Sequence, residues 1–168
     1  MATEADWDAY DRAVIDLAPP GRPALRLVPD RRGATGPWPE GIDAPVVIVT
    51  AWNPDSRVRS EAVNRVAHGD LAAELGRRGV PHWPATGRDP ELVHHEEGVA
   101  LPGMAEVEGV ALGRSYGQAA VYVWTPAAWE VVSCTDGRRR VHGWRTVVTG
   151  HREAAPGDDD GPLIRRRG

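Results

Sequence analysis

The sequence has no lysine and no phenylalanine among its 168 residues, and Cys134 is its only cysteine. Without lysine, the chain cannot form a Schiff base with a substrate or with pyridoxal phosphate, and it cannot supply the lysine of a P-loop. A single cysteine excludes an internal disulfide framework and any zinc site with several cysteine ligands. These absences exclude lysine-dependent chemistry, disulfides and cysteine-rich zinc sites, and the single cysteine agrees with a reducing compartment.

Long hydrophobic runs and the common nucleotide motifs are also missing. No apolar stretch approaches the roughly 18 residues of a membrane span, and the acidic segment 1–12 is unlike a secretory signal peptide. A formal net charge of −4 gives no overall positive field for nucleic acid. Because G-x-G-x-x-G, Walker and G-x-S-x-G sequences are absent, we expect no cofactor. We predict a cytoplasmic protein without membrane or nucleic-acid partners, and the oligomeric state stays open.

What the chain does contain is typical of one globular domain. Hydrophobic residues make up 41% and charged residues 26%, and a chain of this length buries about two-thirds of its unfolded surface. We assign residues 1–150 to a single α+β domain. Residues 151–168 combine an acidic triplet, a basic triplet, glycine and proline, which predicts a solvated, disordered tail.

Hydrophobic periodicity and turn residues predict the order of the elements. Apolar residues at helical spacing predict an N-terminal helix over 3–17, which must end before Pro19. The β-branched run 46–52 is typical of a strand covered on both faces. The other expected elements are strands at 24–28, 80–87, 96–101 and 118–125, helices at about 55–79 and 104–116, and a hairpin of 128–134 and 139–148 around Asp136-Gly137.

From residue 46 to residue 125 this order is β-α-β-β-α-β, the pattern of a ferredoxin-like fold. We therefore predict a split β-α-β two-layer sandwich with an added N-terminal helix and an appended C-terminal β-hairpin. The usual spatial order of that sheet, 4-1-3-2, puts the strand at 80–87 at an edge. An edge tolerates Pro81 and Pro84, because proline cannot donate a hydrogen bond to a neighbouring strand.

The stretch AWNPDS, residues 51–56, is the first candidate site. A strand that turns through Pro54 into a helix leaves backbone N–H groups unpaired, and these favour an anion. Asn53 adds a carboxamide and Trp52 a flat wall for a ring. A purely structural interpretation is also complete, since Asp55 or Ser56 can cap the helix and Trp52 can be core.

The stretch HHEEG, residues 94–98, is the second candidate. In an extended segment its side chains alternate between two faces, so they cannot all bind one metal ion, and we predict no metal site. Glu96 or Glu97 is a candidate general base, because burial raises the pKa of a carboxyl group. Asn64, in the middle of a helix, and Gln118, at the start of a strand, are further candidate ligand-binding residues, although each can equally serve the fold.

Several motifs together resemble the bacterial family catalogued as domain of unknown function 3293. They are AWNPDS followed by Ser60 and Asn64, then LAAELGRRG, PATGRDP, EEGVALPG and LGRSYGQAAVYVW, and they cover about residues 46–124. Gly98 departs from the small hydroxyl residue expected after the paired acids. The resemblance implies no reaction. It does single out the positions at which this chain carries the family's polar residues, which are Trp52, Asn53, Ser56, Asn64, Glu96, Glu97 and Gln118.

The predicted sandwich separates these residues into two groups. Asn53 and Ser56 would lie at one edge of the sheet, and Glu96, Glu97 and Gln118 near the opposite edge, about 15–20 Å away. The first functional hypothesis is therefore a small anionic or amide-bearing ligand at the strand-to-helix turn. The second is a metal-free hydrolase or transferase that uses Glu96 or Glu97 as general base. The third is a protein-interaction module with Trp129 and Trp144 as exposed anchors.

Overall fold

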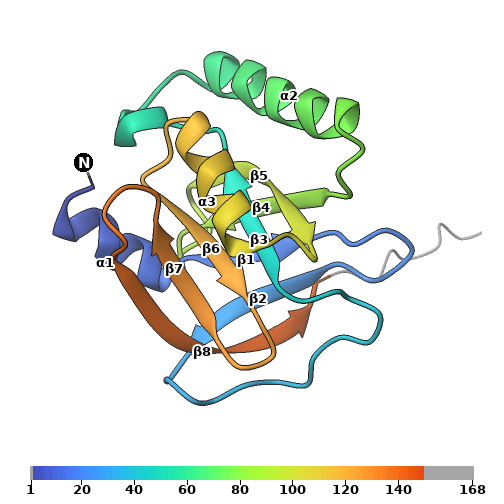
Figure 1. Ribbon diagram of the computed structural model, residues 1–168. Coiled ribbons are helices and arrows are strands. Elements are labelled where there is room, and N and C mark those ends of the chain that lie inside the picture. Colours follow the sequence, from blue (N-terminus) through green and yellow to red (C-terminus); the bar gives the residue numbers. More distant parts are fainter. Residues whose placement is uncertain (1, 150–168) are drawn as a thin grey trace, which may run out of the picture.

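A computed structural model describes residues 2–149 (Figure 1). Strands of this part of the chain form a closed antiparallel barrel in the order β1-β2-β8-β7-β6-β3-β5-β4. The predicted tail, residues 151–168, lies outside the described residues. The elements are α1 (Glu4–Arg12), β1 (Val14–Leu17), β2 (Leu25–Asp30), β3 (Val46–Thr50), the 3-10 helix η1 (Pro54–Ser56), α2 (Glu61–Arg77), β4 (Trp83–Arg88), β5 (His95–Pro102), α3 (Glu106–Ser115), β6 (Ala120–Trp124), β7 (Trp129–Ser133) and β8 (Arg139–Val148).

The predicted ferredoxin-like sandwich is wrong, because the sheet closes on itself. The four middle strands do lie in the order β6-β3-β5-β4, which is the 4-1-3-2 order of a ferredoxin-like sheet. However, β7 extends this sheet beside β6, β1 extends it beside β4, and β2 and β8 pair to complete the wall. The predicted hairpin, β7 and β8, is therefore part of the barrel and not an appendage.

The strand predicted to lie at an edge, β4, has a neighbour on each side. β5 pairs with residues 83–88, whereas β1 pairs only with residues 85–88. Pro84 therefore lies in the part of β4 that has one paired strand, where a missing backbone N–H costs little.

The N-terminal helix is shorter than predicted. α1 begins after Thr3, whose side chain accepts from the backbone N–H of Asp6 while the Asp6 carboxylate accepts from that of Thr3. It ends at Arg12, and residues 14–17 form β1 instead. Their apolar residues fit a helical spacing, but pairing with both β2 and β4 gives them a strand conformation. Tertiary pairing has overridden a local pattern here.

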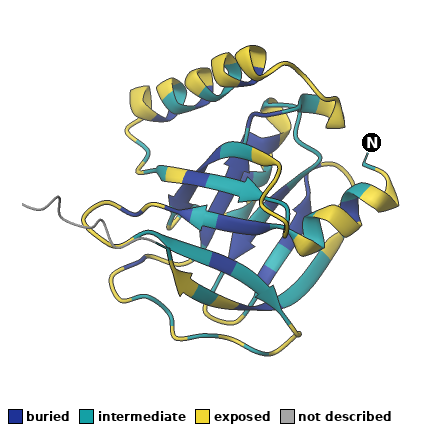
Figure 2. Ribbon diagram, turned by 180° about the vertical axis from the view of Figure 1, so that it is seen from behind, coloured by how far each residue is buried: buried dark blue, intermediate teal, exposed yellow. Residues whose placement is uncertain are grey.

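Two apolar cores lie on either side of the barrel wall. The barrel interior is filled by a cluster that includes Trp124, Trp129 and Trp144. The other cluster lies outside the wall, where α2 and α3 cover β3, β5 and β6. Alternate residues of β3 belong to the two clusters, so the prediction of a strand covered on both faces is confirmed. In Figure 2 the buried residues lie mainly in the strands, and exposed residues cover the outer side of the helices.

Candidate functional site

The strand-to-helix turn and the acidic pair lie at the same end of the barrel. β3 is antiparallel to both β5 and β6, so its last residues lie beside the first residues of those strands. The predicted separation of about 15–20 Å is therefore wrong. The side-chain amide nitrogen of Asn53 lies 2.7 Å from Glu96 Oε1. Antiparallel neighbours bring the end of one strand to the start of the next, which the sequence argument had overlooked.

A pocket of about 330 Å³ opens at this end of the barrel. Its apolar walls come from residues whose side chains point into the barrel, including Ile15, Ile48, Ala85 and Ala120, and α1 covers one side. A cavity of this size with mostly apolar walls and a few polar groups is typical of a small-molecule site. We call it the mouth pocket.

Glu96 supplies a buried carboxyl group to the mouth pocket. It shares the inward face of β5 with Gly98 and Ala100, because side chains alternate along a strand. Burial raises the pKa of Glu96, and the hydrogen bond that Asn53 donates offsets only part of this rise. Glu97 lies on the opposite face of β5 and is not part of the pocket lining. Of the two predicted candidates, only Glu96 therefore faces the cavity.

Asn53 and Asn64 hold Glu96 in place. Asn64 is buried, with 2% of its surface exposed, and its carboxamide makes two hydrogen bonds to Asn53. Its oxygen accepts from the backbone N–H of Asn53 at 2.9 Å, and its nitrogen donates to the side-chain oxygen of Asn53 at 3.0 Å. The same Asn53 oxygen also accepts from the backbone N–H of Arg59 at 2.9 Å. The Asn53 carboxamide is thereby fixed with its N–H₂ group toward Glu96, and Asn64 acts from behind the pocket.

Several backbone N–H groups of the turn, which the sequence pattern predicts to bind an anion, have partners within the protein. Besides the Asn53 N–H, the backbone N–H of Asp55 donates to Gly117 O at 2.8 Å, and that of Arg57 donates to Pro54 O at 3.2 Å. These groups are therefore occupied within the protein. The prediction that Asp55 or Ser56 caps the helix is wrong, because both residues have positive φ angles, of 58° and 54°. Ser60 caps α2 instead, since its side chain accepts from the backbone N–H of Val63.

Trp52 and Gln118 line the mouth pocket and also serve the fold. Trp52 is 6% exposed, and its ring centroid lies 5.6 Å from that of His95. The Gln118 side-chain nitrogen donates to Trp52 O at 3.0 Å and to Tyr116 O at 3.4 Å, so it ties the start of β6 to the end of β3. Ser56 also lies in the lining. Trp52 and Gln118 therefore have a structural role and also lie in the pocket lining.

Two tyrosines of the pocket were not among the site residues predicted from the sequence. Tyr122, on the inward face of β6, stacks on Trp129 with centroids 4.7 Å apart and donates to Tyr10 O at 3.3 Å. Burial raises the pKa of both tyrosines, and the nearby Ser56 side chain partly offsets the rise at Tyr10. The alternation of side chains along β6 would have placed Tyr122 on the inward face of this strand. Tyr10 comes from α1, whose docking across the barrel mouth has no local sequence signal.

The rim of the pocket carries His94 and His95. Among the described residues, no group of three or more His, Cys, Asp or Glu side chains is arranged to hold a metal ion. None of the helices within residues 2–149 has the length and the apolar character needed to cross a membrane.

Residues 49–121 match the model of the family described as Protein of unknown function (DUF3293), which confirms the resemblance drawn from the motifs. No curated protein and no solved structure matches the chain. The matched span contains Asn53, Asn64, Glu96 and Gln118, whereas Tyr10 and Tyr122 lie outside it. Since the family description names no ligand or reaction, a functional hypothesis has to start from the geometry of the pocket.

Proposed function

We propose that the protein binds a small molecule in the mouth pocket and that an N–H group of this ligand, such as an amide, donates a hydrogen bond to Glu96. The observation that carries the proposal is a carboxyl group held inside a cavity of about 330 Å³ with mostly apolar walls. Asn53 occupies one carboxylate oxygen of Glu96, which leaves Oε2 to accept from a ligand.

The same geometry argues against the anionic half of the sequence-based hypothesis. The N–H groups of Asn53, Asp55 and Arg57 donate within the protein, so the turn offers few donors to an anion. A carboxylate beside the cavity also repels negative charge. An amide or another N–H donor satisfies Glu96 and leaves the rest of the ligand against the apolar walls.

A titration followed by NMR tests this proposal. We expect butyramide to shift the backbone amide signals of Gly98 and Ala120, which line the pocket, and to bind more weakly to Glu96→Gln than to the wild type. Glu97→Gln is the matched control, because Glu97 belongs to the same strand but faces away from the cavity. If a set of small amides and amines leaves the Gly98 and Ala120 signals unmoved, the mouth pocket is not a binding site.

A second candidate function is general-base catalysis by Glu96. A carboxyl group with a raised pKa, oriented by Asn53, is the arrangement that enzymes use to accept a proton near neutral pH. The hydrolase hypothesis expects the carboxylate form to be active, so the rate of ester or amide hydrolysis should rise as the pH increases through the raised pKa of Glu96.

Hydrolysis of p-nitrophenyl butyrate tests this second candidate. We expect Glu96→Gln to lower the rate by about 10²-fold, the usual contribution of a positioned base, while Glu97→Gln retains the wild-type rate. Equal rates for the wild type and Glu96→Gln would rule out this role.

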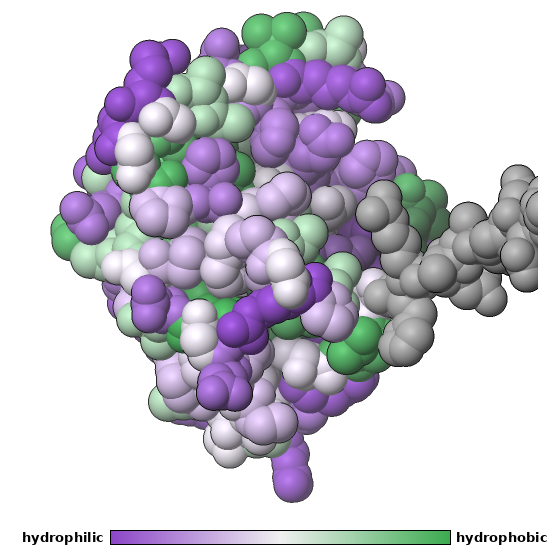
Figure 3. Space-filling view, turned by 90° about the vertical axis from the view of Figure 1, so that its right-hand side faces the viewer, coloured by the Kyte–Doolittle hydropathy of each residue, from purple (hydrophilic) through white to green (hydrophobic). Residues whose placement is uncertain are grey.

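The interaction-module hypothesis requires exposed tryptophans, and the two that it names are buried. Trp129 and Trp144 are 0% and 1% exposed and belong to the barrel core, so neither can anchor a partner. On the face in Figure 3, hydrophobic residues appear as separate groups between polar ones.

A further inference from the structure

The lining of the mouth pocket contains more acidic than basic side chains. Three carboxylates belong to its lining: Glu96 from β5, Asp6 from α1 and Asp89 from the loop after β4. Arg88 is the one arginine among these described lining residues, and its guanidinium donates to Asp16 at 2.8 Å. Asp16 alternates with the inward residues of β1, so this pair lies toward the outer face of the wall.

The neighbouring ion pairs do not restore the balance. Asp16 also accepts from Arg26 at 2.7 Å and 3.0 Å, so one aspartate and two arginines make up the outer cluster. Counting the lining alone gives one arginine against three carboxylates. Adding Asp16 and Arg26 gives two arginines against four carboxylates, so the excess of negative charge is the same. His94 and His95 are the remaining titratable side chains at the rim apart from Tyr10 and Tyr122.

Aromatic side chains surround the same cavity. Tyr10, Tyr122 and Trp52 all contribute to its lining, and Tyr122 is held flat against Trp129 at an interplanar angle of 9°. The faces of tyrosine and tryptophan rings attract cations, and this attraction is stronger where water is excluded. A carboxylate together with several aromatic rings is the combination that recognises an ammonium group.

We infer that the ligand of the mouth pocket carries a primary ammonium group on a short apolar chain. This inference rests on the proposed function and specifies the charge of its ligand. The ammonium N–H groups donate to Glu96 Oε2, because Oε1 already accepts from Asn53. The alkyl chain lies against Ile48, Ala85 and Ala120, where the small alanine side chains leave room. An ammonium group compensates the buried carboxylate more fully than an amide does, because it is charged as well as a donor.

Four probes of the same length separate the contributions of charge and shape. They are n-butylammonium, 1-butanol, butyramide and butyrate, titrated at pH 8 and low salt into the full chain while the Gly98 and Ala120 amide signals are recorded by NMR. At this pH butylammonium is protonated. We expect n-butylammonium to bind at least tenfold more tightly than butyramide, and butyrate to bind most weakly.

Variants assign the preference to Glu96. Glu96→Gln keeps an oxygen acceptor for Asn53 but removes the charge, and we expect it to bind butylammonium and butyramide with equal affinity. Glu97→Gln should retain the tenfold preference of the wild type. Circular dichroism and thermal melting establish that both variants are folded before the titrations are compared.

The outcomes distinguish the two proposals. If butyramide or 1-butanol binds as tightly as butylammonium, the ammonium inference is overturned and the mouth pocket remains a binding site. Tighter binding of butyrate overturns the inference too, because the sign of the charge is then wrong. If none of the four probes shifts the Gly98 and Ala120 signals, the proposed function itself fails. A preference for butylammonium that persists in Glu96→Gln contradicts the role given to Glu96.

Discussion

Glu96 is the residue at which stability and function are expected to conflict. Its carboxyl group lies in an apolar cavity, and desolvation raises its pKa above the value of 4.5 for a free glutamate. The folded state therefore holds the proton to a higher pH than the unfolded state does. Between the unfolded and the folded pKa, stability falls as the pH rises, because the folded protein must then bury a charge.

The first prediction follows for Glu96→Gln. The glutamine has no charge to bury, so at pH 8 we expect it to stabilise the protein by on the order of 1 kcal/mol, as often happens when a functional group is removed. The gain should disappear as the pH falls through the raised pKa of Glu96 toward 4.5, because the wild-type side chain is then neutral as well. Urea unfolding at several pH values measures this difference. Lower stability of Glu96→Gln at pH 8 would mean that the carboxylate is well solvated.

Asn64 carries the second prediction at the residue scale. Replacing it with alanine leaves the backbone N–H and the side-chain oxygen of Asn53 without two of their partners. We expect Asn64→Ala to destabilise the protein by about 2 kcal/mol, the usual cost of leaving a buried polar group unpaired. Ser60→Ala, which removes an exposed helix cap in the same region, should cost about 1 kcal/mol. Urea unfolding of both variants gives the comparison, and an Asn64→Ala effect no larger than that of Ser60→Ala contradicts the buried network.

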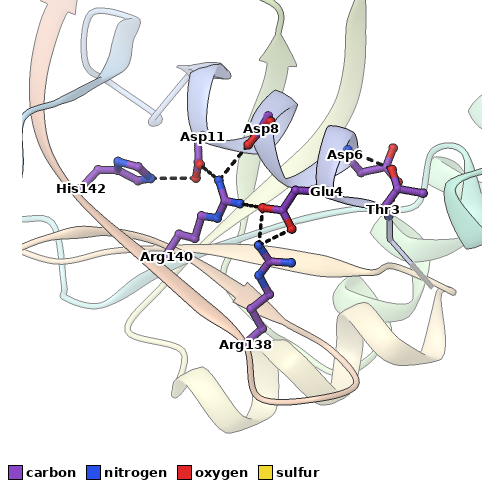
Figure 4. Close-up of polar contacts among 8 residues, drawn as sticks. All are labelled: Thr3, Glu4, Asp6, Asp8, Asp11, Arg138, Arg140 and His142. Carbon is purple, nitrogen blue, oxygen red and sulfur yellow. Dashed lines mark hydrogen bonds and ion pairs between the residues drawn. The ribbon is translucent and has the colours of Figure 1, made fainter.

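Among the elements, α1 closes one side of the pocket and is held by ion pairs to β8 and to Arg138, the residue before it. Arg138 donates to the two carboxylate oxygens of Glu4 at 2.7 Å and 2.8 Å, and its guanidinium lies 4.5 Å from the Trp7 ring centroid. Figure 4 shows Arg140 between Glu4, Asp8 and Asp11 of the helix. One arginine thus contacts three carboxylates spread along α1.

The third prediction concerns this attachment. We expect Arg140→Gln to raise the hydrogen exchange rate of the amides of residues 4–12 by about tenfold, because the helix then opens locally without global unfolding. Salt of 0.5 M should reduce the difference from the wild type, since it screens the remaining charges. Arg65→Gln, which breaks an exposed pair with Glu61 in α2, should leave exchange in α1 unchanged. Unchanged exchange in Arg140→Gln would mean that the other contacts of the helix, including Trp7 packing and the Arg138–Glu4 pair, hold it without Arg140.

The elements that sequence patterns predict well are those whose signals are local. β3, α3 and the hairpin of β7 and β8 lie close to their expected positions, because β-branched runs, helical stripes and Asp136-Gly137 act within a few residues. α2 ends near its predicted end but begins at Glu61, about six residues later than predicted. β1 was assigned to a helix, since its four residues fit both periods. The same distinction applies to the site residues. Asn53 and Glu96 were predicted from their residue types in local motifs, whereas Tyr10 reaches the pocket only through the docking of α1.

At the scale of the whole molecule, closure of the barrel was beyond sequence reasoning. It depends on two long-range pairings, residues 14–17 with 85–88 and residues 25–30 with 143–148. No turn motif or residue spacing in the sequence predicts either pairing. In addition, β2 contains Pro29, and proline disfavours paired strands. The middle four strands satisfy a ferredoxin-like order equally well with or without closure. Local sequence patterns therefore predict only an open sheet, although the mouth pocket exists only because the sheet closes.

Gly143 tests closure directly. It pairs with Asp30 across the junction of β2 and β8, and the loop after β2 folds back over it, with Trp144 N–H donating to Ala34 O at 2.8 Å. A Cβ atom at position 143 would collide with the carbonyl oxygens of Arg31 and Ala34, so the loop has to move. We expect Gly143→Ala to cost about 2–3 kcal/mol in urea unfolding. Gly69→Ala is the matched control: nothing lies within 4 Å of its added Cβ in α2, so the same substitution should stabilise by about 0.5–1 kcal/mol. Equal stability of the two variants would mean that the contact between this loop and β8 does not hold the barrel closed.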